Sequence, residues 1–416
     1  MRVMALRGHQ DFSRLWTGET ISQFGAILGY TVFPLLAAQL LHASPFEMGL
    51  LEAALMSAFL VIGLPAGVWV DRMRRRPLMI AMDLLRAALV LTVPIAWWLD
   101  ALTLPHLIVM ALFLGVCTVF FDVAYQSYLP SLVGRDHLVE GNAKLQASAS
   151  VVEVTGPGLG GFAVQFLGAA NAVLATGVGY LSSAFFLWRI RAAEPTPVRH
   201  ESPNLVREVR EGLAFVFSNR TLRAIVGCTG TANLFNGVRM AVLVLFLVRT
   251  LDLTAAQAGL VFSFGGLGGV LGALTATRVQ KWVGQARLIW VSMVVTSPAP
   301  LLMPLAGPGL RMGFALASVF VFGYGVIVYN IAQVSYRQAI CPDHLLGRMN
   351  ASIRWVVWGA QPIGALAGGV IGEWIGIVGT LWVSAIGGTL ASLWVVLSPL
   401  RTMRDIPEIS SVKSHG

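Results

Sequence analysis

The sequence predicts an all-α membrane protein in which twelve transmembrane helices form two parallel six-helix repeats. Three observations carry this prediction: an apolar composition with few charges, apolar segments of membrane-spanning length, and an internal repeat. Of the 416 residues, 56% are hydrophobic and only 12% are charged, whereas about 25% of the residues of a soluble protein are charged. The mean hydropathy is +0.73. This composition excludes a disordered chain, a soluble nucleic-acid-binding fold and a secreted disulfide scaffold.

Apolar segments, separated by Pro, Gly and charge clusters, divide the chain into twelve lengths. A bilayer core about 30 Å thick requires about 20 predominantly apolar residues per helix, and each segment meets that requirement. The predicted spans are 13–41, 46–70, 77–99, 104–129, 141–167, 169–190, 221–249, 255–278, 285–304, 311–336, 347–373 and 376–397.

Lys and Arg are distributed unequally between the two sets of loops that this topology creates. Positive residues stay on the cytoplasmic side of short loops. If both termini are cytoplasmic, that side collects most of the basic residues, including the block 72–76, and the other side keeps little more than Arg249 and Arg311. We therefore predict a multi-pass protein of the cytoplasmic (inner) membrane with both termini inside. The net charge of +9 then reflects topology, and we expect no nucleic-acid partner.

A polar, proline-containing segment interrupts the chain halfway. It divides the protein into an N-terminal six-helix half (1–190), a cytoplasmic linker (191–220), a C-terminal six-helix half (221–400) and a cytoplasmic tail (401–416). Within the linker, Leu205, Val209, Leu213 and Phe217 form one apolar stripe. This spacing predicts an amphipathic helix that lies on the membrane surface.

The two halves resemble each other at an offset of about half the chain. Because six spans separate equivalent residues, both copies have the same orientation, and the repeat axis runs along the membrane normal. Such an architecture implies a cavity between the halves and permits alternating access by rocking of one half against the other. At an offset of 208, the residues Ser127, Tyr128, Asn142, Gly156 and Gly160 match Ser335, Tyr336, Asn350, Gly364 and Gly368.

Two sequence motifs resemble those of the major facilitator superfamily. The loop GVWVDRMRRRP (67–77) is similar to the GxxxDRxGRR signature, and GPGLGG (156–161) is similar to the core of the antiporter motif. The segments LPAGVWVDRMRRRP and SYLPSLVGRDHLVEGNAKL resemble the branch that contains macrolide-efflux and enterobactin-export proteins. Two departures stand out: Arg74 replaces the second glycine of the signature, and Val152 and Ala143 occupy glycine positions of the antiporter motif. The resemblance covers nearly the whole chain and implies the major facilitator fold.

Charges close to the cytoplasmic ends of the first-half spans are predicted to form a gating network. An ion pair at a helix junction can lock one conformation and release it in another. The motif Gly156, Pro157, Gly160 and Gly161 is predicted to bend the fifth span and to pack it closely against a neighbour. The predicted gating residues are Gly67, Asp71, Arg72, Arg75, Asp83, Arg86 and Asp122.

Two carboxylates are predicted to couple transport to protons. Ionisable groups inside spans are costly and indicate function. Glu153 lies twelve residues beyond Gly141, which is about 18 Å at the helical rise and thus close to the middle of the bilayer. The alternative role for the Glu153 carboxylate is to bind a cationic group of the substrate. Glu19 is the second candidate, whereas Arg239 is expected near the outer surface, where it can snorkel.

Polar and aromatic residues in spans one, seven, ten and eleven are predicted to form the substrate cavity, because the resemblance implies that these helices line it. Such a cavity suits a large amphipathic molecule. The predicted cavity residues are Gln23, Phe24, Asn233, Asn236, Asn330, Gln333, Trp358 and Gln361.

These features predict a secondary transporter that exports a drug-like or secondary-metabolite small molecule, of the macrolide type, in exchange for protons. The first alternative is a siderophore exporter; proton-coupled uptake and a membrane-embedded enzyme or sensor are further alternatives. No GxxxxGK[ST], HExxH or GxSxG motif occurs, so neither ATP-driven pumping within this chain nor the commonest hydrolase chemistry is supported. We expect a monomer with substrate, protons and lipid as partners, and without an enzymatic activity, metal or cofactor.

Overall fold

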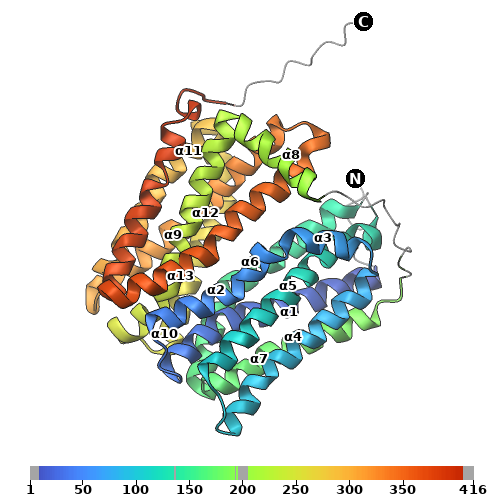
Figure 1. Ribbon diagram of the computed structural model, residues 1–416, viewed down its shortest axis with the longest axis vertical. Coiled ribbons are helices and arrows are strands. Elements are labelled where there is room, and N and C mark those ends of the chain that lie inside the picture. Colours follow the sequence, from blue (N-terminus) through green and yellow to red (C-terminus); the bar gives the residue numbers. More distant parts are fainter. Residues whose placement is uncertain (1–8, 135–136, 193, 195–204, 406–416) are drawn as a thin grey trace, which may run out of the picture.

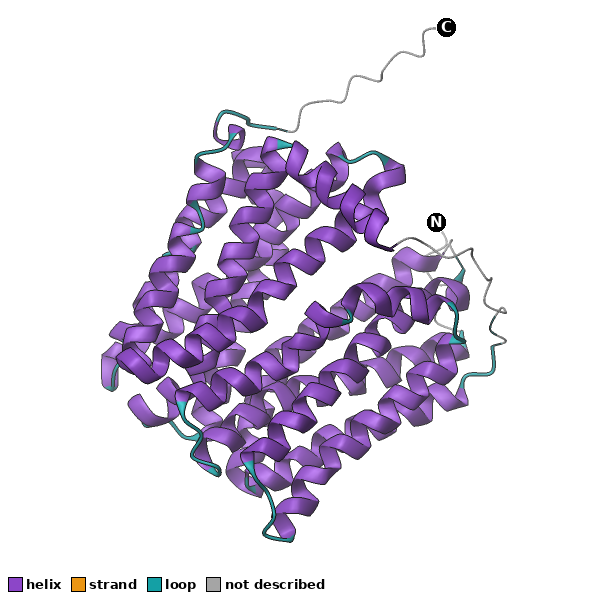
Figure 2. Cartoon of the chain, in the orientation of Figure 1, coloured by secondary structure: helices purple, strands orange, loops and turns teal. Residues whose placement is uncertain are grey.

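The computed structural model describes residues 9–134, 137–192, 194 and 205–405. Over these ranges every regular element is a helix (Figure 2). The helices form two bundles that lie side by side, the first built from the N-terminal half of the chain and the second from the C-terminal half (Figure 1). The chain is therefore an all-α membrane protein of two six-helix repeats, as the composition and the repeat predict.

The first bundle contains six crossings. The second crossing consists of two helices, because the helix breaks at Ile62, directly before Gly63. The elements are α1 (Gln10–Gln39), α2 (Pro45–Val61), α3 (Gly63–Asp71), α4 (Arg75–Trp98), α5 (Leu104–Val133), α6 (Leu138–Leu167) and α7 (Ala169–Arg189).

The second bundle repeats this pattern after the linker helix α8 (Leu205–Ser218). Its last two crossings are both within α13, where Gly376 adopts a φ of 76° that glycine tolerates and that reverses the chain direction. The elements are α9 (Arg220–Leu245) with η3 (Phe246–Thr250), α10 (Ala255–Val283), α11 (Gln285–Thr296) with η4 (Ala299–Leu305), η5 (Gly309–Arg311), α12 (Met312–Ile340), α13 (Asp343–Leu390), α14 (Leu393–Val396) and η6 (Pro399–Arg401).

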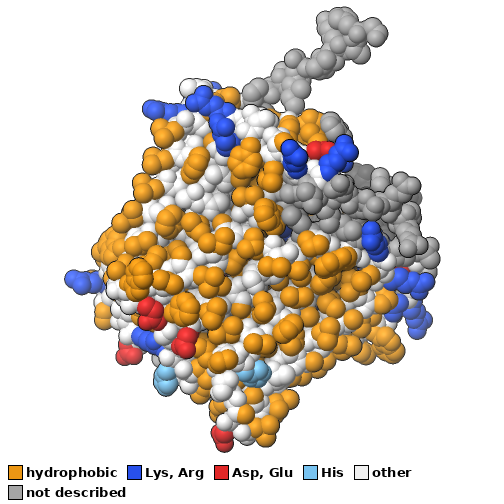
Figure 3. Space-filling model, viewed as in Figure 1, with side chains coloured by type: hydrophobic (Ala, Val, Ile, Leu, Met, Phe, Trp, Pro, Cys, Tyr) orange, Lys and Arg blue, Asp and Glu red, His pale blue; other side chains and the backbone are white. Residues whose placement is uncertain are grey.

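The two ends of the molecule differ in charge. We call the end that carries α8 and the connection between α3 and α4 the α8 side, and the opposite end, with the loops 40–44, 99–103, 251–254 and 306–308, the far side. Figure 3 shows Lys and Arg gathered at the margin of the α8 side, and acidic and His side chains at the far side. The basic asymmetry of the sequence is therefore an asymmetry of the folded molecule.

Contacts between the two bundles concentrate toward the far side. They join mainly α2 to α13 and α6 to α10. At Gly161 the backbone of α10 comes so close that an added Cβ would overlap with the carbonyl oxygen of Ala255. Among the described residues, the hydrogen bonds that cross between the bundles are Arg249 Nη2 to Ala38 O (3.1 Å), Phe46 N to Glu373 Oε1 (3.1 Å), Ala256 N to Gln165 Oε1 (3.2 Å), Gly158 N to Ser263 Oγ (2.9 Å) and Trp355 Nε1 to Leu60 O (2.8 Å). The bundles are therefore closed against each other at the far side.

Candidate functional site

A cavity of about 890 Å³ lies mostly within the second bundle. Its walls come from α9, α11 with η4, α12 and α13, and the first bundle contributes Glu153 of α6. Its lining extends to Gln338 and Asn350, which lie close to the α8-side ends of α12 and α13. A volume of this size accommodates a drug-sized molecule.

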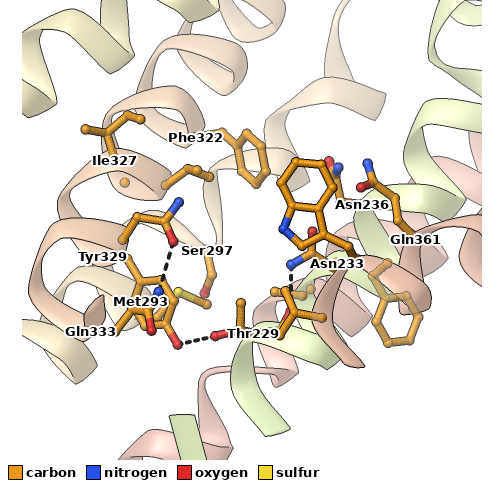
Figure 4. A pocket seen from close by; sticks show the side chains of 18 of the residues that line it. Thr229, Asn233, Asn236, Met293, Ser297, Phe322, Ile327, Tyr329, Gln333 and Gln361 are labelled. Atoms are coloured by element: carbon orange, nitrogen blue, oxygen red, sulfur yellow. Dashed lines mark hydrogen bonds between the residues drawn. The ribbon is translucent and has the colours of Figure 1, made fainter. Parts of the chain in front are cut away.

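Polar side chains from α9 and α12 face the cavity from two walls. Figure 4 shows Thr229 and Asn233 of α9 across from Tyr329 and Gln333 of α12. The Thr229 and Tyr329 hydroxyls are 2.8 Å apart, and Asn233 Nδ2 donates to the Thr229 carbonyl oxygen at 2.9 Å. These bonds hold the side chains in place, so the wall has a fixed pattern of donors and acceptors. Gln333 Nε2 donates to Asn330 Oδ1 at 3.2 Å.

Six of the eight predicted cavity residues line this cavity: Asn233, Asn236, Asn330, Gln333, Trp358 and Gln361. Gln23 and Phe24 are not among its lining residues, because the cavity lies in the second bundle and both residues belong to α1 of the first. Gln23 instead donates from Nε2 to Glu19 Oε1 at 2.8 Å. The sequence analysis did not select Arg337, Thr229 or Phe322, which also line the cavity. Arg337 follows Gln333 by one helical turn, a spacing that could have indicated it.

The expectation that Arg239 snorkels to the outer surface is wrong. Arg239 lines the cavity, and its guanidinium carbon lies 4.5 Å from the centre of the Phe322 ring. Its Nη2 donates to Asn236 Oδ1 at 2.6 Å. Arg239 lies three residues after Asn236 and six after Asn233, so the three side chains share one face of α9. The neighbouring helices thus hold the cation inside the protein.

Glu153 is the one acidic residue among the described residues that line the cavity. Its side chain is exposed to the cavity, and over the part of the chain that the structure describes it makes neither a hydrogen bond nor an ion pair. A water-accessible carboxylate in this position can exchange a proton or meet a substrate.

A second group of charges is buried in the first bundle. Asp83 and Arg86, one turn apart on α4, form a buried ion pair. The Arg86 guanidinium lies between two aromatic rings, 4.0 Å from the centre of Phe121 and 4.4 Å from that of Tyr180. Cation–π contacts of this kind stabilise a desolvated arginine. Asp83 and Arg86 are therefore fixed parts of this bundle.

Two further carboxylates belong to the same group. Glu19 is buried, and its Oε2 has no hydrogen-bond partner among the described residues. Asp122 interacts electrostatically with both Glu19 and Arg86. We call Glu19, Asp83, Arg86 and Asp122 the N-half charge cluster. It brings together three of the predicted gating residues and one predicted proton carrier.

The loop between α3 and α4 carries the other predicted gating residues. An added Cβ at Gly67 would meet no atom within 4 Å, so Gly67 does not mark a close approach of two helices in this conformation. Arg72 is exposed, and the side chain of Asp71 lies outside the described part of the structure. The amide groups of Arg75 and its neighbour Arg76 donate to the Glu194 carboxylate at 2.6 and 3.2 Å. Glu194 caps α4, a role that the sequence analysis missed.

The predicted packing motif of α6 lies between two helices. Gly156 approaches Ile27 of α1, and Gly160 approaches Thr31 one turn further along the same helix. On its other face, α6 meets α10, where an added Cβ at Gly259 would overlap with the carbonyl oxygen of Pro157. The small residues Gly156, Pro157, Gly160 and Gly161 thus allow α6 to pack against its own bundle and against the other one.

Comparisons with known proteins agree with this architecture. A model of the Major Facilitator Superfamily matches residues 15–360. The multidrug efflux pump Tap of Mycolicibacterium fortuitum is 26% identical over 392 residues, which cover 90% of this chain and 93% of that protein. The enterobactin exporter EntS of Citrobacter koseri is 27% identical over 422 residues, which cover 98% and 97%. The crystal structure of a bacterial homologue of the iron transporter ferroportin in an inward-facing state superimposes with a TM-score of 0.76 at 15% identity, covering 94% of this chain and 98% of that one.

Proposed function

Because the chain belongs to the major facilitator superfamily, we propose that it is a secondary active exporter of a large amphipathic small molecule, a drug or a secondary metabolite, in exchange for protons. The observation that carries this proposal is the cavity of about 890 Å³ beside a closed far-side interface. A substrate that enters from the α8 side is held there until the bundles rock and the far side opens.

The charge asymmetry and the names of the relatives support export as the direction of transport. We assign the basic α8 side to the cytoplasm because Lys and Arg accumulate in cytoplasmic loops. The cavity then loads from the cytoplasm. The names of Tap and EntS describe exporters, of several drugs and of a siderophore respectively. Siderophore export is therefore the second candidate function.

Glu153 and Glu19 are the proposed proton carriers. Glu153 is exposed to the cavity and Glu19 belongs to the N-half charge cluster. Each is tested by replacement with glutamine, which has the same shape and cannot ionise. For the residue that carries the proton, the variant is expected to keep substrate exchange across the membrane and to lose uphill export. A variant that retains pH-dependent export excludes its residue from the coupling.

The proposed function is tested by measuring accumulation in an efflux-deficient bacterial host that expresses the chain, with macrolides, dyes and siderophores as test compounds. We expect the host to accumulate less of at least one compound, and an uncoupler to abolish the difference. Higher accumulation of a compound would contradict export and favour uptake. The matched control is the same host with the Gly158→Trp variant, because a large side chain at Gly158 would collide with Ser263 and prevent closure of the far side.

A further inference from the structure

We propose that the cavity binds its substrate through an anionic group, such as a carboxylate or an acidic phenol, held by Arg239 at the deep end. This inference rests on the proposed function and specifies its substrate class: an acidic amphipathic molecule in place of a cationic drug. It comes from the arginines that line the cavity.

Three arginines line the cavity at increasing depth from the α8 side. Arg337 lies three residues before the end of α12, and Arg354 lies eleven residues into α13, which is about 16 Å at the helical rise. Arg239 lies nineteen residues into α9, or about 28 Å. An anion that enters from the α8 side thus meets a cation at the entrance, at mid-depth and at the deep end. Such a series attracts an anion into the cavity.

The charge balance of the lining is positive. The charged lining residues are the three arginines and Glu153, so the cavity wall carries an excess of two positive charges even when Glu153 is ionised. Arg354 has one acidic neighbour, since it interacts electrostatically with Asp122 of α5. No carboxylate lies within salt-bridge distance of Arg239, Arg337 or Arg354 in the described ranges.

Two of these guanidinium groups have unused donors. The Nε atoms of Arg239 and Arg337 are buried, and neither has a hydrogen-bond partner among the described residues. Within the part of the chain that the structure describes, Arg239 makes a single hydrogen bond, to Asn236, although a guanidinium carries five N–H donors. Leaving a buried donor unpaired is costly, and a planar, bidentate acceptor such as a carboxylate satisfies two donors at once. The free fork of Arg239 is therefore suited to an anionic group.

The surroundings of Arg239 indicate that the ligand is also apolar. Phe322 packs against the guanidinium at 4.5 Å, and Phe235 and Trp358 line the same cavity. The Trp358 side chain is 44% exposed, so its indole is available for contact. A ligand with an aromatic or aliphatic portion and one acidic group therefore matches both the aromatic side chains and the guanidinium of this wall.

The test is equilibrium binding of three dansyl probes to the purified chain in lipid nanodiscs. The probes share one fluorophore and differ in charge: dansylglycine is anionic, dansylamide is neutral and monodansylcadaverine is cationic. Binding is read from dansyl emission on excitation of tryptophan. We expect the wild type to bind dansylglycine at least about tenfold more tightly than the other two probes, because charge-assisted bidentate hydrogen bonds are the strong ones.

Substitution of single arginines then tests which of them binds the carboxylate of dansylglycine. Arg239→Gln is expected to reduce dansylglycine affinity at least about tenfold and to leave dansylamide affinity unchanged, which shows that the variant is folded. Arg278→Gln, at an exposed position of α10 outside the cavity, is the matched control and should bind like the wild type. If Arg239→Gln does not fold, Arg239→Lys and Arg337→Gln provide the same comparison with smaller losses.

A wild type that prefers monodansylcadaverine, or an Arg239→Gln variant that keeps the preference for dansylglycine, would overturn the inference. Both outcomes leave the proposed export function intact. Conversely, a chain that binds dansylglycine through Arg239 and exports no compound from cells supports the inference and contradicts the proposed function.

Discussion

The charged residues inside the membrane form two groups, one in each bundle. The N-half charge cluster is buried around the Asp83–Arg86 ion pair and contains Glu19 and Asp122. The cavity of the second bundle is lined by Arg239, Arg337 and Arg354. Since a charge inside a membrane is costly, both groups require a functional reason. We infer that residues of the first bundle bind the coupled protons and that the second bundle binds the substrate.

The Glu19→Gln variant tests this division at the residue level. A proton that binds Glu19 removes a charge from a buried cluster, so the substitution should disconnect that cluster from the proton gradient. We expect uphill export to fall at least about tenfold, in the range typical of coupling between sites, while binding of dansylglycine is unchanged. The measurement is export at several pH gradients.

Glu52→Gln is the matched control, because Glu52 is also a buried carboxylate of the first bundle and lies on α2. It should export like the wild type. Equal losses in the two variants would mean that any buried carboxylate of this bundle affects folding, and the coupling role of Glu19 would be refuted.

At the scale of single elements, the linker helix α8 is attached to the second bundle through an ion pair and apolar contacts. Glu211 of α8 forms ion pairs with Arg207 of the same helix (2.8 Å) and with Arg348 of α13 (2.5 Å). Val216 is buried against residues of α9 and α13, whereas Phe217 of the predicted apolar stripe is 50% exposed. The face that α8 buries is therefore centred on Gly212 and Val216, and it packs against α13.

The Glu211→Gln variant should loosen α8. The hydrogen bond from Arg207, with the charge of Arg348, holds the pKa of Glu211 below its ordinary value. The ion pairs are therefore fully present above the ordinary pKa of a glutamate and are lost as the pH falls through the lowered pKa. In the variant, amide hydrogen exchange over 205–218 should be faster at neutral pH. Arg207→Gln, which keeps the pair with Arg348, should give a smaller change; an equal or larger change would contradict the docking role of Arg348.

Most helices could be predicted from the sequence, because length and hydropathy determine where a membrane helix must lie. Gly376, which begins the predicted last span, is the residue at which α13 reverses. The break at Ile62 was not predicted, although Gly63 and Pro65 follow it directly and are residues that interrupt helices. The position of Arg239 was predicted by depth alone, and depth does not say which face of a helix meets the cavity. The Glu194 cap of α4 depends on a contact between segments 119 residues apart, which periodicity does not reveal.

In the whole molecule, the proposed export requires the two bundles to separate at the far side so that the substrate can leave. Gly158 of α6 and Ser263 of α10 meet there, with a hydrogen bond of 2.9 Å between Gly158 N and Ser263 Oγ. A Cβ at Gly158 would lie 3.9 Å from the Ser263 Cβ, within the range of about 3.5–4.5 Å that a disulfide requires.

The double variant Gly158→Cys, Ser263→Cys should therefore form a disulfide that locks the far side closed. We expect the oxidised protein to bind dansylglycine from the α8 side and to lose transport, and a reducing agent to restore it. The native Cys117, Cys228 and Cys341 are buried, so the two single variants are sufficient controls. Full transport by the cross-linked protein would show that the bundles do not part at this interface.

The driving force depends on the charge of the substrate. Exchange of an outgoing monovalent anion for an incoming proton moves two charges in the same electrical direction. A membrane potential of 100 mV therefore contributes about 4.6 kcal/mol to each exchange. Exchange of a monovalent cation for a proton is electrically neutral. An acidic substrate is therefore expected to respond to the membrane potential as well as to the pH gradient.

The most direct test of the account is substrate accumulation in respiring everted membrane vesicles, in which the cytoplasmic face is outside and the lumen is acidic and positive. We predict that vesicles with the wild-type chain concentrate an acidic amphipathic compound in the lumen. Nigericin, which removes the pH gradient, and valinomycin with potassium, which removes the potential, should each slow this accumulation, and Arg239→Gln should abolish it. Accumulation that is absent from energised vesicles, or that occurs only in right-side-out vesicles, would contradict proton-driven export.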